Sequence, residues 1–89
     1  MDKKLQHIIR QGKSEKVEFK SAFHDDVIVT LVAFANSKGG RVYVGIHDDG
    51  TIKGAQIGKE TIQKWMNEIK SKTQPSIIPT IEVLYMDKK

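Results

Sequence analysis

The expected fold of this chain depends on residues 34–54, which read Phe-Ala-Asn-Ser-Lys-Gly-Gly-Arg-Val-Tyr-Val-Gly-Ile-His-Asp-Asp-Gly-Thr-Ile-Lys-Gly. The pair Gly39-Gly40 supplies the backbone freedom with which a chain leaves a helix. Residues 41–47 then alternate between apolar and other side chains, which is typical of a half-buried strand. Asp49-Gly50 indicates a tight turn, because glycine accepts the positive φ that such turns need. This one stretch therefore predicts a helix end, a strand and a hairpin.

The flanking segments have periodicities of their own. Apolar residues at helical spacing predict a short peripheral helix that stops at Gly12, a central helix from Asp25 to a last turn at 36–38, and a further helix within 58–72. Alternation with period two predicts strands over 16–20, 41–47, 52–54 and 81–86. In the second strand, the three residues expected to face the core are Val42, Val44 and Ile46.

These elements predict an α+β fold with a small mixed sheet of about four strands. Two main helices should pack on one face of the sheet, and the short N-terminal helix should be added to them. The first two strands flank the central helix, so they should be parallel neighbours with a right-handed crossover. Residues 1–89 are expected to form one domain, with the N-terminal helix in 1–12 and the core in 13–86. Since the last strand has no return, we expect the domain to be truncated at its C-terminus.

Composition narrows the classes of function. The chain of 89 residues has no cysteine, which excludes disulfides and thiolate metal sites, and we expect no cofactor. Its net charge of +4 favours an anionic partner. No apolar run approaches the roughly 20 residues of a membrane span, so we expect a cytoplasmic protein without a membrane partner. Gly12-Lys13-Ser14 and residues 54–60 both lack the spacing of a phosphate-binding P-loop, which argues against an ATPase.

Four segments of the chain have the order and spacing that are typical of one known family: Val17-Glu18-Phe19-Lys20, residues 33–36, residues 39–50 and Ile52-Lys53-Gly54. Together they resemble the Schlafen-AlbA-type domain over roughly residues 12–86. The resemblance implies a DNA-binding domain of bacterial or archaeal transcriptional regulators and helicase-like proteins.

The same resemblance raises an alternative, because some Schlafen proteins are ribonucleases that hold divalent metal with three acidic residues. The resemblance places one of these acids at Glu18 and one at Asp48, with Asp49 as a near alternative. The third position, five residues before Glu18, is Lys13. A lysine in place of a metal ligand argues against nuclease activity, since carboxylates are needed to neutralise the ions. We therefore expect a binding domain without catalytic or metal-binding residues.

The expected nucleic-acid contacts are cations at strand margins or beside the hairpin, with three polar or aromatic neighbours: Lys16, Lys20, Asn36, Lys38, Arg41, Tyr43, His47 and Lys53. We predict that the cations converge on one surface that follows the phosphate backbone of a nucleic acid. The resemblance implies that this nucleic acid is DNA rather than RNA. No residue set promises base readout, so binding should be largely non-specific.

Each of these assignments has an alternative. The cations could form an ordinary solvated face, Asn36 could act only as a helix cap, and Tyr43 and His47 could stack on bases or pack beneath another element. Trp65 is expected in the core because of its spacing with Ile62 and Ile69. A third hypothesis is a protein-interaction module, a homo-oligomer that forms through the exposed edge of the last strand.

Overall fold

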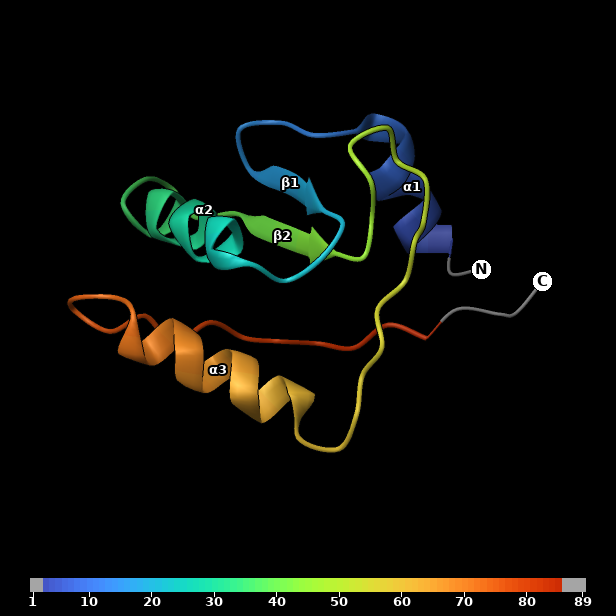
Figure 1. The fold of residues 1–89 in the computed structure, drawn as a ribbon. Helices are drawn as coiled ribbons and strands as arrows, with labels where there is room; N and C mark the ends of the chain where they lie inside the picture. Colours follow the sequence, from blue (N-terminus) through green and yellow to red (C-terminus); the bar gives the residue numbers. More distant parts are fainter. Residues whose placement is uncertain (1–2, 86–89) are drawn as a thin grey trace.

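The computed structural model describes residues 3–85. In this part of the chain, three helices accompany a two-stranded sheet (Figure 1). The elements are α1 (Lys3–Gln11), β1 (Val17–Lys20), α2 (Asp25–Ala35), β2 (Arg41–Val44) and α3 (Thr61–Ser71). Within residues 3–85, every helix is too short to cross a bilayer as an apolar span.

The two strands form the predicted parallel pair. Val17 pairs with Arg41 and Lys20 pairs with Val44. Parallel strands need a crossover connection, and α2 provides it and packs against β2. The α+β class, the parallel pair and its connecting helix are therefore confirmed.

The best-buried cluster lies between α1 and the sheet. Phe19 is only 1% exposed, and it packs with Leu5 and Ile46, which are both 5% exposed. Ile8 and Ile9 complete the apolar stripe of α1 against this cluster. The helix that was predicted to be peripheral therefore contributes to the core, since a chain this small has few other apolar side chains with which to cover Phe19.

Gly45 interrupts the predicted alternation of the second strand. Its φ is +99°, and the N–H groups of both Gly45 and Ile46 donate to the carbonyl oxygen of Lys20, at 2.7 and 3.2 Å. Two residues on one strand thus face one residue on the other, as in a β-bulge. Ile46 consequently joins the cluster around Phe19 on the same side as Tyr43, so the prediction that it shares a face with Val42 and Val44 is wrong.

The prediction of about four strands is also wrong for the described residues. The expected return strand at 52–54 is reduced to a single antiparallel bridge between Ile46 and Ile52. Residues 81–85 are extended but belong to no ladder, and the last residue of that predicted strand, Met86, lies outside the described residues. Strand pairing depends on a neighbour as well as on pattern, and alternation alone does not supply the neighbour.

Candidate nucleic-acid interface

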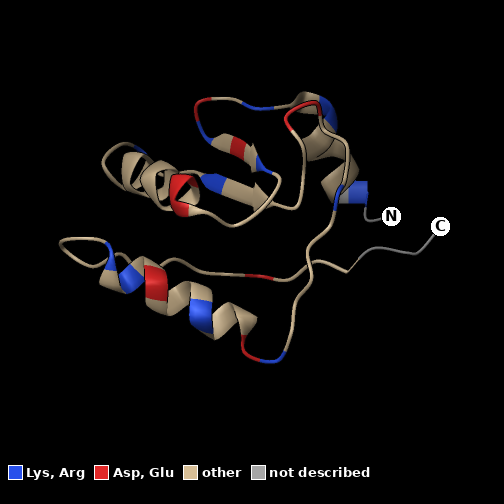
Figure 2. Ribbon diagram, viewed as in Figure 1, with Lys and Arg blue, Asp and Glu red and all other residues tan. Residues whose placement is uncertain are grey.

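Three cations gather at the amino end of the sheet, and we call Lys16, Lys38 and Arg41 the basic end. Lys16 and Arg41 lie side by side, because the backbone N–H of Arg41 donates to the carbonyl oxygen of Lys16 at 2.8 Å. Lys38 lies in the turn between α2 and β2. Figure 2 shows this arrangement in blue at the start of β2 and in the turn before it. All three residues are exposed, and none takes part in an ion pair among the described residues.

The turn that carries Lys38 follows from local sequence. Asn36 is the C-cap of α2, and its backbone N–H donates to the carbonyl oxygen of Val32 at 3.0 Å. Gly39 has a φ of +90° and donates to the carbonyl oxygen of Phe34 at 2.9 Å, so glycine supplies the left-handed residue of this helix end. Asn36 has a φ of −88° and is exposed. It therefore serves as a cap without the left-handed conformation, and its side chain is accessible for a contact.

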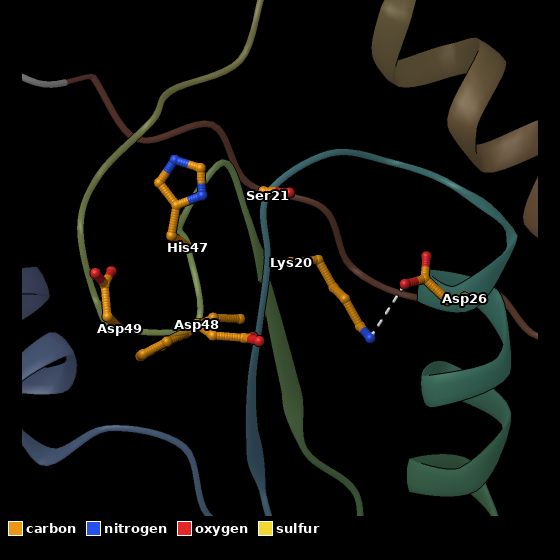
Figure 3. Close-up of a pocket in the computed structure, with 7 residues that line it drawn as sticks. Lys20, Ser21, Asp26, His47, Asp48 and Asp49 are labelled. Carbon is orange, nitrogen blue, oxygen red and sulfur yellow. Dashed lines mark ion pairs between the residues drawn. The ribbon is translucent and has the colours of Figure 1, made fainter.

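Lys20 lies at the opposite, carboxyl end of the sheet and is surrounded by acids. Its Nζ is 3.2 Å from Asp26 Oδ2, shown by the dashed line in Figure 3, and 3.9 Å from Glu18 Oε2. It lines a pocket of about 560 Å³, which we call the acidic pocket; the other lining residues are Phe19, Ser21, Asp26, His47, Asp48 and Asp49. Three aspartates line this pocket, which lies at the end of the sheet opposite the basic end. Lys20 and His47 are therefore separated from the basic end. The predicted single cationic surface is thus divided between two ends of the sheet.

The other predicted contact residues occupy different surroundings. The ring of Tyr43 meets that of Phe19 edge-on, with 6.2 Å between centroids, and it packs against the core cluster. His47 is exposed on the turn that also carries Asp49. The N–H of Lys53 donates to the carbonyl oxygen of Gly45 at 2.8 Å, and the residue is exposed on the return segment, outside the basic end. Tyr43 is thus packed on one side against the core cluster and remains partly exposed.

Lys13 bridges the two acidic residues of the nuclease hypothesis. Its Nζ is 3.1 Å from Asp48 Oδ1 and 3.6 Å from Glu18 Oε2. The hydrogen bond to Asp48, assisted by the charge of Glu18, raises the pKa of Lys13 above 10.5. Within residues 3–85, no group of three acidic or histidine side chains could hold a metal ion. An ammonium group therefore sits where a cation between these two carboxylates would sit.

Asp49 has a different, local role. Its Oδ1 accepts a hydrogen bond from the N–H of Thr51 at 2.9 Å. This interaction with Thr51 lowers the pKa of Asp49 below 3.8. The side chain thus stabilises the hairpin turn in its ionised form, a common use of aspartate at turns.

Two features of this region were not predicted from the sequence. The bridging role of Lys13 depends on a contact across 35 residues, which no local pattern signals. Asp26 could be predicted only as a favourable charge at a helix N-terminus, whereas it also neutralises Lys20.

The fold and the placement of these residues define a small α+β domain with a parallel strand-helix-strand unit and a basic end. A family model described as Schlafen, AlbA_2 matches residues 13–89. The chain therefore belongs to the Schlafen, AlbA_2 family, in agreement with the resemblance found in the sequence. Comparisons with curated proteins and with solved structures gave no match.

Proposed function

We propose that this domain binds nucleic acid through the phosphate backbone, and that it is a DNA-binding part of a transcriptional regulator. The observation that carries the proposal is the basic end, where Lys16, Lys38 and Arg41 come together from two strand margins and a turn. Family membership supports the same class of partner. Each phosphate contact would release a counterion, and this release drives most non-specific binding.

The charges elsewhere in the domain limit where a polyanion can lie. Lys13, Lys20 and Lys72 are each within 3.2 Å of an aspartate oxygen, so each of these charges already has a carboxylate partner on the domain surface. The acidic pocket would repel phosphates at the carboxyl end of the sheet. A bound backbone should therefore follow the amino end, where the cations of the basic end have no carboxylate partner among residues 3–85.

The proposed contacts favour affinity over sequence recognition. Lysine and arginine contacts to phosphates fix position on the nucleic acid but carry no base information. Tyr43, the aromatic residue of β2, is engaged with Phe19. We therefore expect similar affinity for unrelated duplex sequences of equal length.

Charge reversal at the basic end tests the proposal. Fluorescence anisotropy with labelled duplex DNA, single-stranded DNA and RNA would compare the wild type with Lys16→Glu and Arg41→Glu. Lys64→Glu is the matched control, because Lys64 is exposed on α3 and the charge change is the same. We expect both variants at the basic end to lose at least about tenfold in affinity for duplex DNA at low salt, from the lost contact and the added repulsion. Equal losses in all three variants, or none, would contradict the assignment of the site.

The nuclease hypothesis requires a different event at the other end of the sheet. Glu18 and Asp48 would have to exchange the Lys13 ammonium for divalent metal. Incubation of labelled RNA and DNA with the domain and Mg²⁺ or Mn²⁺ tests this hypothesis directly. Cleavage that disappears in Glu18→Gln would establish it in place of simple binding.

A further inference from the structure

A groove separates β2 from the extended segment 79–85. Its volume is about 870 Å³, and α2 and α3 contribute to its walls. The lining from β2, α3 and the segment includes six apolar side chains: Val42, Val44, Ile62, Trp65, Ile81 and Val83. Figure 1 shows the segment, in red, passing between β2 and α3. An apolar groove of this size inside so small a domain leaves much surface hydrated that could be buried.

One wall of the groove is a strand edge without a partner. The N–H groups of Arg41 and Gly45 donate to Lys16 and Lys20, toward β1. In a parallel ladder, alternate residues bond to the strand on one side. The N–H and C=O groups of Val42 and Val44 therefore point away from β1, and no backbone hydrogen bond among residues 3–85 gives this edge a neighbouring strand.

The opposite wall has the properties of a strand that lacks its ladder. Ile81 and Val83 are half-buried, whereas Thr80, Glu82 and Leu84 are exposed, so the segment alternates as a strand does. No backbone hydrogen bond within the described part of the chain involves residues 79–85. The segment follows α3 and runs in the same direction as β2 in Figure 1. It therefore has the direction that a strand-helix-strand connection gives to a parallel neighbour.

We propose that segment 79–85 acts as a strap that pairs with the outer edge of β2 as a third parallel strand and closes the groove. Pairing would satisfy backbone groups on both walls at once and would bring Ile81 and Val83 against Val42 and Val44. Backbone groups that lose water without a partner are strongly disfavoured, so the burial of this apolar surface requires the ladder. In this proposal, the unpaired segment 79–85 seen in the structure is the open form of the strap. This inference does not depend on nucleic-acid binding.

Engineered disulfides test the closure, because the chain has no cysteine of its own. Val44→Cys would be combined with Ile81→Cys or with Val83→Cys, and each protein would be oxidised at low concentration. A disulfide needs Cα atoms within about 7 Å, and pairing of the two strands would bring same-face residues that close. The matched control combines Val44→Cys with Glu82→Cys, whose side chain lies on the other face of the segment. We expect an intramolecular disulfide in at least one of the first two proteins and none in the control.

The fluorescence of Trp65 provides a second readout of the closure of the groove. This residue is the only tryptophan, it lines the groove, and its ring stacks on Phe23 with 4.7 Å between centroids. Oxidation of a same-face pair should move its emission to shorter wavelength, and reduction should reverse the shift. A disulfide between two molecules would instead place a second copy on this edge and would overturn the proposal.

Amide exchange of the wild type covers the case in which the cysteine variants do not fold. We expect slow exchange at the amides of Val42 and Val44 and at every second residue of the segment 79–85. These amides should exchange at least about tenfold more slowly than those of an unstructured chain. Rapid exchange at all these positions, or the absence of a disulfide in both same-face pairs of a folded protein, would refute the closure.

Discussion

Gly45 offers the sharpest test of the packing described above, because a single added methyl group meets backbone rather than a side chain. The residue is buried, and its φ is +99°. A Cβ at this position would lie 3.0 Å from the carbonyl carbon of Gly54 and 3.1 Å from its oxygen. Gly45→Ala should therefore introduce two separate costs, one from the backbone conformation and one from the overlap.

The magnitude of each cost can be estimated. A positive φ costs an L-residue roughly 1–2 kcal/mol relative to glycine. Overlap in a packed region typically costs a further 1–3 kcal/mol, here by pushing the return segment away from β2. Gly54→Ala is the matched control, because Gly54 has a φ of +83° but no atom lies within 4 Å of its added Cβ. Only the conformational cost, again roughly 1–2 kcal/mol, applies to that variant.

Urea unfolding followed by circular dichroism would measure the two free energies. We expect Gly45→Ala to be the less stable variant by about 1–3 kcal/mol, with unchanged dependence on denaturant. If the two alanine variants lost equal stability, the close approach of Gly54 to β2 would not contribute, and the hairpin geometry deduced from it would be wrong.

Three other outcomes follow from the core and the charges. Phe19→Ala should cost about 3–5 kcal/mol in the free energy of unfolding, whereas Val29→Ala, at a side chain 68% exposed, should change it by less than about 0.5 kcal/mol. The pKa of Lys13 is raised above 10.5, so its contribution is present below pH 10.5 and is lost as the pH rises further; the stability difference between the wild type and Lys13→Gln should narrow in alkaline titrations. Three phosphate contacts predict that the logarithm of the affinity for duplex DNA falls with the logarithm of the salt concentration with a slope of about −3. Arg41→Glu should reduce the magnitude of this slope by about 1. Equal slopes for the wild type and the variant would contradict a contact between Arg41 and a phosphate.

Local signals in the sequence were sufficient for the parallel pair. Helical spacing from Asp25, the glycines at 39 and 40 and the alternation after Arg41 identify α2 and β2, because each element depends mainly on its own residues. A glycine within a predicted strand, such as Gly45, often marks a close approach of another backbone or a ligand, and in the structure Gly54 supplies the approaching backbone. Its effect on the face of Ile46 could not be predicted, since a bulge requires knowledge of the partner strand.

Long-range features could not be predicted to the same extent. Alternation indicated strands at 52–54 and 81–86, but a ladder needs a partner strand at hydrogen-bonding distance, and the pattern does not identify that partner. The cations were grouped by their positions beside strands, whereas their availability depends on carboxylates that approach from elsewhere. Asp26 and Asp48 neutralise Lys20 and Lys13 through contacts that only the folded chain creates.

The first turn of α2 joins two parts of the domain that are distant in sequence. Asp26 holds the ammonium of Lys20 at the end of β1, and the neighbouring Asp25 holds that of Lys72 just after α3, at 2.9 Å. Unwinding of this one turn would release both tethers together. Fraying at this corner should thus loosen the sheet margin and the third helix in a single concerted event.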